Sequence, residues 1–148
     1  MIKKTLLPFL FGVMIILSGA ASAENSQDFG DYVVHFNALN TSYLPPAITR
    51  EYGLKRSKNR GMLNVAVLRK VMGTTGKPVE AEISASATNL TGQKRNITLR
   101  EIREGNAIYY IGDFPIAHEE TLRFTLQVKP GDKGDAHEVK FSHQFFTE

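Results

Sequence analysis

Five basic side chains lie close together in the sequence, in a segment that could bind an anion. Between residues 50 and 60, called the basic segment below, only Glu51 is acidic, and the basic positions are Arg50, Lys55, Arg56, Lys58 and Arg60. A guanidinium can donate two parallel hydrogen bonds to a carboxylate or phosphate, and a tyrosine ring offers a stacking face. Tyr52 lies within the segment. The pattern predicts a site for an anionic small molecule or an acidic protein surface; the alternative is a solvated loop that only favours solubility.

Histidines are the other side chains that could do chemistry, and they are scattered along the chain at His35, His118, His137 and His143. The last two are six positions apart, which is about 20 Å along a straight strand at roughly 3.3 Å per residue. These two cannot share one metal ion. The His118-Glu119-Glu120 cluster would need ligands from elsewhere. We therefore expect no cofactor and no metal, although an enzyme or metal carrier that uses His35 or His118 is an alternative.

Catalytic motifs are absent from the sequence. It contains no Gly-x-Ser-x-Gly, no His-Glu-x-x-His and no glycine-rich phosphate loop. It has no cysteine either, which excludes disulfides, thiolate metal sites and a cysteine nucleophile. Paired carboxylates such as Glu80 and Glu82 lie on the polar side of an alternating pattern, where solvated charges are the rule. The sequence favours a protein that is not an enzyme.

The elements that would position these residues read as short strands. Apolar and polar residues alternate with a period of two between turn signals, which is typical of strands with one buried face. One segment, 47–52, lies between Pro45-Pro46 and Gly53, which predicts a short helix. We predict an all-β fold, a single immunoglobulin-like antiparallel β-sandwich with one short helix, and a small barrel is the competing architecture. The sandwich would have about seven strands, at 31–39, 62–71, 79–88, 95–103, 107–113, 121–129 and 137–146.

Two adjacent tyrosines, Tyr109 and Tyr110, lie in one of these strands. Neighbouring side chains of a strand point to opposite faces of the sheet. We expect one ring to be buried with its hydroxyl bonded to the backbone, and the other to be exposed. The exposed ring could form part of a ligand platform.

The N-terminus resembles a bacterial secretion signal. Lys3 and Lys4 precede an apolar run over 6–17, and Ala21-Ser22-Ala23 has the small-x-small pattern of a cleavage site. We predict a signal peptide over 1–23, cleavage after Ala23, one domain over 24–148, and a periplasmic location with no membrane span after cleavage. Without the two lysines the formal net charge falls from +3 to +1, so a nucleic-acid partner is not expected.

Several segments resemble a family of small secreted proteobacterial proteins known as domain of unknown function 4426. The segments are 29–38, 52–58, 64–65, 89–93, 103–111 and 141–146, which span nearly all of the predicted mature chain. The resemblance implies a single-domain, all-β secreted protein of unassigned activity, and it brings no catalytic residues. It places Arg56, Ser57 and Lys58 within the central signature of the family.

These observations favour a periplasmic, non-enzymatic binding or accessory module. In the expected site Arg56 gives the bidentate contact, Lys58 and Arg50 a positive field, and Tyr52 the stacking face. The full set of candidate ligand-binding residues is Arg50, Tyr52, Arg56, Ser57 and Lys58 of the basic segment, with His35 and Asn37 of the neighbouring strand. The alternative is a chaperone-like or structural module that adds a partner's strand to an exposed sheet edge.

Overall fold

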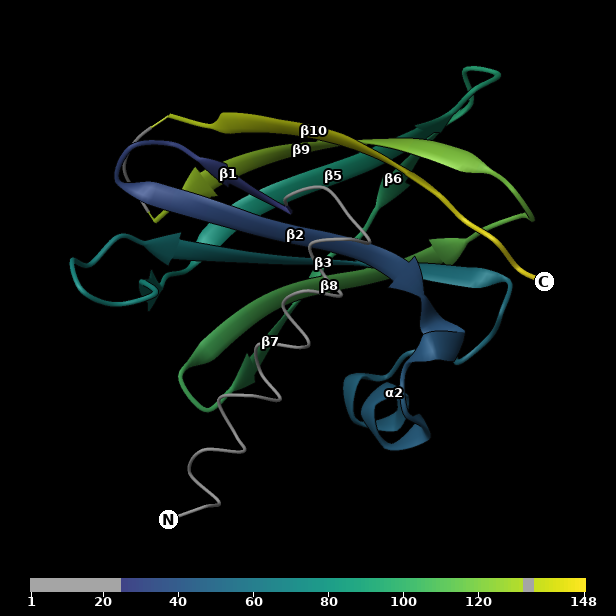
Figure 1. Cartoon of the computed structure of the whole chain (residues 1–148), viewed down its shortest axis with the longest axis horizontal. Coiled ribbons are helices and arrows are strands. Elements are labelled where there is room, and N and C mark those ends of the chain that lie inside the picture. The colour runs from purple at the N-terminus through teal and green to yellow at the C-terminus, as the bar shows by residue number, and fades with distance from the viewer. Residues whose placement is uncertain (1–24, 132–134) are drawn as a thin grey trace, which may run out of the picture.

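A computed structural model describes residues 25–131 and 135–148 of the chain. The predicted signal peptide over 1–23 and its cleavage site lie outside the described residues. The described part contains ten strands, one α-helix and one 3-10 turn (Figure 1). The strands are β1 (Ser26–Asp28), β2 (Tyr32–Asn40), β3 (Arg60–Arg69), β4 (Lys77–Pro78), β5 (Ala81–Asn89), β6 (Lys94–Ile97), β7 (Arg100–Glu104), β8 (Ala107–Pro115), β9 (Thr121–Pro130) and β10 (His137–Gln144); the turn is η1 (Thr41–Tyr43) and the helix is α2 (Pro46–Tyr52).

The strands form two antiparallel sheets packed face to face, as the alternating pattern predicts. The larger sheet has the order β1-β2-β3-β8-β7, with β4 paired to β3, and the smaller sheet has the order β10-β9-β5-β6. In Figure 1 the smaller sheet lies uppermost and α2 lies below the end of β2. This arrangement confirms the predicted all-β, immunoglobulin-like sandwich.

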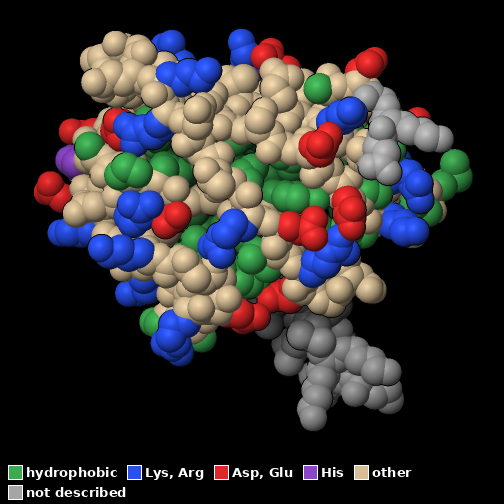
Figure 2. Space-filling view, turned by 180° about the vertical axis from the view of Figure 1, so that it is seen from behind, with side chains coloured by type: hydrophobic (Ala, Val, Ile, Leu, Met, Phe, Trp, Pro, Cys, Tyr) green, Lys and Arg blue, Asp and Glu red, His purple; other side chains and the backbone are tan. Residues whose placement is uncertain are grey.

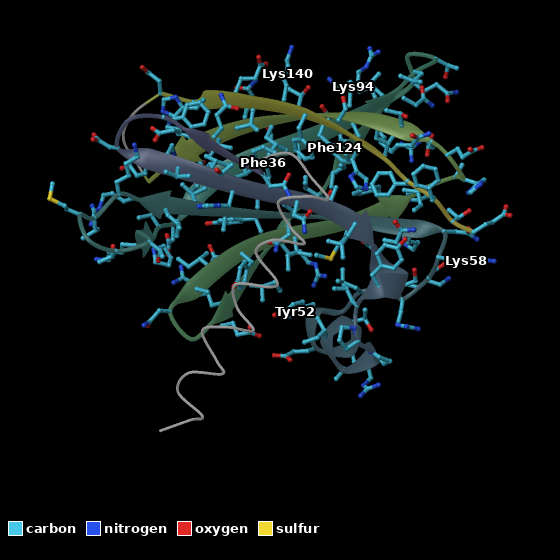
Figure 3. The ribbon with its side chains drawn as sticks, viewed as in Figure 1. Phe36, Tyr52, Lys58, Lys94, Phe124 and Lys140 are labelled. Carbon is cyan, nitrogen blue, oxygen red and sulfur yellow. The ribbon has the colours of Figure 1, made fainter. Side chains whose placement is uncertain are left out.

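The main core lies between the two sheets and consists of the inward side chains that the period-two pattern predicts. Phe36 of β2 stacks on Phe141 of β10 at 4.4 Å between ring centroids, and Phe141 stacks on Phe124 of β9 at 4.8 Å. Figure 3 shows Phe36 and Phe124 between the two sheets. Offset aromatic pairs of this kind add stability beyond the area that they bury. This stack joins β2 of the larger sheet to two strands of the smaller one.

One predicted strand is in fact two. The segment 95–103 contains β6, which pairs with β5 in the smaller sheet, and β7, which pairs with β8 in the larger sheet. The chain crosses between the sheets at 98–99, and a Cβ on Gly112 of β8 would clash with the carbonyl oxygen of Thr98. Glycine at this position is what permits the crossing chain to pass. This division and the short strands β1 and β4 explain why ten strands are described instead of about seven.

A second apolar cluster lies on the outer face of the larger sheet. The buried side chains of Leu54, Met62 and Ile111 form its centre, and Leu44 and Tyr52 pack against it from the segment that contains α2. The helix begins after Pro45 and ends at Gly53, whose φ of 69° is left-handed, as the proline and glycine positions predict. The segment 41–59 therefore covers one end of this outer face and carries the basic segment with it.

Candidate functional site

The basic segment is held to the sandwich by Thr41, whose side chain is fully buried. Its hydroxyl accepts a hydrogen bond from the Ser57 amide at 2.9 Å. It lies within donating distance of two carbonyl oxygens, that of Lys55 at 2.8 Å and that of Ser57 at 2.9 Å. The backbone of Ser57, one of the candidate ligand-binding residues, is thus bonded to the buried Thr41. The Ser57 hydroxyl accepts a hydrogen bond from the Asn59 amide.

Three further contacts fix the segment. The Arg56 Nε donates to the Leu44 carbonyl oxygen at 2.8 Å, and an Arg100 guanidinium nitrogen donates to the Tyr52 carbonyl oxygen at 2.5 Å. The Tyr52 hydroxyl donates to a Glu104 carboxylate oxygen at 2.8 Å. This hydrogen bond raises the pKa of the Tyr52 phenol to about 12. Since the Tyr52 ring also packs against the second cluster, it anchors α2 to β7.

The charged ends of the segment remain open to solvent. Arg50, Lys55, Arg56 and Lys58 are all exposed, and none of them makes an ion pair with any residue that the structure describes. Lys58 points away from the sandwich in Figure 3, and basic side chains gather on the α2 side of the molecule in Figure 2. Arg60 differs, because it forms an ion pair with Asp113 of β8 at 3.1 Å and so joins two neighbouring strands of the larger sheet. Four uncompensated positive charges therefore lie on a firmly held support.

His35 and Asn37 lie elsewhere. Both are exposed on the outer face of β2, opposite Ala66 and Asn64 of β3. Among the described residues no hydrogen bond or ion pair joins either side chain to the basic segment. Five of the seven candidate residues thus lie on α2 and the loop that follows it, where the Tyr52 ring packs against the larger sheet, and the other two lie on the uncovered part of that sheet.

His35 lines a feature that the sequence analysis missed, a hollow of about 510 Å³ on the outer face of the larger sheet. The outward side chains Ala66 and Leu68 of β3 and Tyr109 of β8 line it together with Pro78. The signal was present in the sequence, because the middle of the predicted strand 62–71 is apolar on both faces. That pattern is also typical of any central strand, so it did not by itself indicate a binding surface.

Of the two adjacent tyrosines, Tyr110 is buried as predicted, whereas Tyr109 is half-buried instead of exposed because it packs against the second cluster. Tyr110 is 7% exposed, and its hydroxyl accepts a hydrogen bond from the Ala81 amide at 2.8 Å. Burial raises the pKa of this phenol. Tyr109 points to the outer face and lines the hollow. Beside Tyr110, the Arg103 guanidinium contacts Glu101 of its own strand and Glu80, which precedes β5, so polar contacts join the two sheets along this side.

The histidines have separate surroundings. His137 stacks on Phe29 at 4.5 Å, and His143 meets the ring of Phe145 edge-on at 4.5 Å. Burial lowers the pKa of His143. His118 accepts a hydrogen bond from the Thr147 amide. Within residues 25–131 and 135–148 no three metal-ligating side chains of histidine, cysteine, aspartate or glutamate come together. The described helices include none with the length and apolar character needed to cross a membrane.

Comparison with solved structures places this sandwich among known folds. FetP of uropathogenic Escherichia coli strain F11 is similar with a TM-score of 0.60 and 14% identity over 84% of this chain and 94% of FetP. A copper-bound variant of FetP gives a TM-score of 0.60 and 15% identity over 83% of this chain and 95% of that one. At such identities the likeness shows the shared fold. A comparison with curated proteins finds no significant match.

A nearer relative is a DUF4426 family protein from Pseudomonas aeruginosa PAO1, whose crystal structure is similar with a TM-score of 0.71. The two sequences are 39% identical, and the similarity covers 82% of this chain and 93% of the relative. The model of the same family, described as a domain of unknown function, matches residues 26–148. The resemblance seen in the sequence is therefore confirmed, and the chain belongs to the DUF4426 family.

Proposed function

We propose that this protein is a non-enzymatic binding module of the periplasm, and that its basic segment contacts an anionic ligand or an acidic partner surface. The observation that carries the proposal is the combination of uncompensated charge and firm support. Arg50, Arg56 and Lys58 have exposed charged ends without an acidic partner among the described residues, while the backbone between them is bonded to the buried Thr41.

Firm support matters for affinity. A flexible loop must lose conformational freedom when it binds, and that loss weakens the complex. Here the hydrogen bonds of Thr41 and the Arg56–Leu44 contact already hold the backbone. Because the Leu44 contact uses only the Nε of Arg56, the two terminal guanidinium nitrogens are free to donate to a carboxylate or phosphate. In this proposal Arg56 makes the directional contact, and Arg50 and Lys58 supply attraction.

The periplasmic location is part of the proposal. It is supported by the signal-like pattern of residues 1–23 and by the fold shared with FetP, which was expressed in the periplasm of Escherichia coli. The test is the intact mass of the chain after expression with its own N-terminus in a bacterial host. Cleavage after Ala23 would leave Glu24 as the first residue. A mass that retains residues 1–23 would contradict the proposed processing.

Copper carriage does not belong to the proposal, although a copper-bound form of FetP shares the fold. Copper favours imidazole, thiolate and thioether ligands. This chain has no cysteine, and its described histidines lie apart, with His35 on the larger sheet and His137 and His143 on β10. Among the described residues no three histidine, cysteine, aspartate or glutamate side chains come together, so the proposal names no copper ligands.

The basic segment is tested with the double variant Arg56→Ala/Lys58→Ala and a hexaglutamate peptide as the acidic probe. The matched control is Lys94→Ala/Lys140→Ala, which removes the same charge from the smaller sheet, where Figure 3 shows both lysines. We expect the segment variant to weaken binding by on the order of tenfold or more, because charge-assisted contacts are worth about 1.5–3 kcal/mol each. The control variant should unfold at the temperature of the parent chain, and the segment variant should remain folded but unfold at a slightly lower temperature, because it lacks the Arg56–Leu44 hydrogen bond.

If both variants lose the same affinity for hexaglutamate, the effect comes from net charge alone and the proposal is contradicted. Salt gives a second discriminator, because attraction between exposed charges is screened within about 8 Å at 0.15 M ionic strength. Binding through the basic segment should therefore weaken steeply as salt is added. Binding of inorganic phosphate in the same titrations separates a small-anion site from a protein-docking site.

A second candidate function is strand addition, and one observation favours it. The eight-residue strand β10 lies at an edge of the smaller sheet and pairs only with β9 among the described strands. Its free edge could accept a partner's strand through backbone hydrogen bonds. Such binding should depend weakly on salt and should be blocked by Lys140→Pro but unaffected by Arg56→Ala/Lys58→Ala.

A further inference from the structure

The outer face of the larger sheet has an apolar strip of which only one end is covered. In an antiparallel sandwich the outer face of a sheet is ordinarily polar, because it faces water. Here Met62 and Ile111 are buried beneath the α2 segment. Past the polar Asn64, the outward positions of β3 are again apolar at Ala66 and Leu68, beyond that cover. Tyr109 belongs to both parts, since it packs against the covered cluster and lines the hollow. Part of the apolar surface on this face therefore lies beyond the α2 segment without a cover.

The hollow has a built wall. The chain from Val71 to Pro78 turns back over Leu68, and Gly76 in this turn has a φ of 114°. A Cβ at Gly76 would lie 3.0 Å from the Leu68 Cβ and 3.1 Å from the Arg69 carbonyl oxygen. Only glycine permits both the backbone conformation and this close approach. The local sequence therefore holds the turn against β3 and encloses one side of the hollow.

A positive side chain lies in the hollow that adjoins this one. A second hollow of about 660 Å³ adjoins the first, sharing Pro78, Ala107 and Ile108, and Lys77 and Arg103 line it. Arg103 is already neutralised by Glu101 and Glu80. Lys77 is exposed and makes no ion pair with the described residues, so it provides one uncompensated positive charge next to an apolar surface.

We propose that this hollow binds a single-chain amphiphile with an anionic headgroup, such as a fatty-acid carboxylate. The alkyl chain would lie on Ala66, Leu68 and Tyr109, and the headgroup would lie at Lys77. The volume of about 510 Å³ is within the range of small-molecule sites, and a mostly apolar lining is typical of them; the charged group, Lys77, belongs to the adjoining hollow. Each methylene that is buried strengthens binding by about fourfold. The site is separate from the basic segment and does not depend on it.

The test uses dodecanoate as the probe, below its micellar concentration, with the chain purified after export. Calorimetry should give saturable binding with one site. Octanoate should bind up to about 250-fold more weakly, because as many as four fewer methylenes are buried at about fourfold each. Dodecyltrimethylammonium, which has the same chain and the opposite charge, should bind roughly tenfold more weakly than dodecanoate.

Two variants locate the site. Ala66→Glu puts a carboxylate on the floor of the hollow, and Thr75→Glu puts one in its wall without touching the paired strands. Each should weaken dodecanoate binding by roughly tenfold or more. Lys77→Glu should weaken dodecanoate but not dodecyltrimethylammonium, and Lys129→Glu on the smaller sheet is its charge-matched control. The variant Arg56→Ala/Lys58→Ala should leave dodecanoate binding unchanged, which separates this proposal from the function proposed above.

Three results would overturn the inference. The first is equal affinity for the anionic and cationic twelve-carbon probes, and the second is unchanged dodecanoate binding in both Ala66→Glu and Thr75→Glu. The third is a dimer in sedimentation that Ala66→Glu dissociates, which would show that a second copy of the chain covers the hollow. The inference is supported if the chain is a monomer that binds dodecanoate and if Lys77→Glu weakens that binding.

Discussion

Replacing Thr41 by valine tests whether the basic segment is held to the sandwich as the structure indicates. Valine has nearly the same shape as threonine and replaces only the hydroxyl group. That hydroxyl accepts one hydrogen bond, from the Ser57 amide, and has one proton to share between the carbonyl oxygens of Lys55 and Ser57. The substitution therefore removes two hydrogen bonds at a fully buried position.

The cost can be worked out from these contacts. A typical hydrogen bond contributes about 1 kcal/mol net, and a buried polar group left without a partner costs about 1–3 kcal/mol. Because Thr41→Val leaves the Ser57 amide and a carbonyl oxygen without their partner, we expect a loss of about 2–4 kcal/mol in the free energy of unfolding. For a domain of this size that loss lowers the melting temperature by on the order of 10 °C.

Two assays check this prediction, namely urea unfolding and hydrogen exchange of the Ser57 amide. If the segment loosens locally, the Ser57 amide should exchange faster by roughly tenfold for each 1.4 kcal/mol lost. Thr125→Val is the matched control, since the side chain of Thr125 on the smaller sheet makes no hydrogen bond to the described residues. An unfolding free energy and a Ser57 exchange rate equal to those of the parent chain would refute the argument. A loosened segment should also bind hexaglutamate less tightly.

Three further predictions concern other parts of the fold. Tyr110→Phe leaves the Ala81 amide without its acceptor and should lower the free energy of unfolding in urea by about 1–3 kcal/mol; an unchanged value would mean that water replaces the hydroxyl at no cost. Gly112→Ala puts a Cβ against the Thr98 carbonyl oxygen and should cost about 3 kcal/mol or more in the same assay, while a variant as stable as the parent chain would contradict the tight crossing. In an absorbance titration of the folded chain, Tyr52→Phe should remove an ionisation with a midpoint near pH 12. The pKa of Tyr52 is raised from 10.0 in the folded chain, so the stability that the Tyr52–Glu104 hydrogen bond contributes is complete below pH 10 and is lost as the pH rises through 12. No change in the alkaline titration would contradict the hydrogen bond from Tyr52.

The sequence alone determined the strands that have one buried face, the short helix and the burial of one tyrosine of the pair. These features follow from local rules. The period-two alternation in β9 places Leu122, Phe124 and Leu126 on one side whatever the partner strands are. Proline before a helix and glycine after it act through their own backbone preferences, so the bounds of α2 could be read directly from the chain.

The tertiary structure decided the rest, because the remaining features depend on residues that are far apart in the sequence. Arg60 is neutralised by Asp113 and Tyr52 is anchored by Glu104, each more than 50 residues away, so no local pattern could show which basic residues stay free. The strand order placed His35 beside Ala66 and Tyr109, and it placed the α2 segment over only one end of that face. An apolar residue on a strand gives the same sequence pattern whether its face of the sheet is covered or exposed. Only the packing of the whole chain determines where water is excluded.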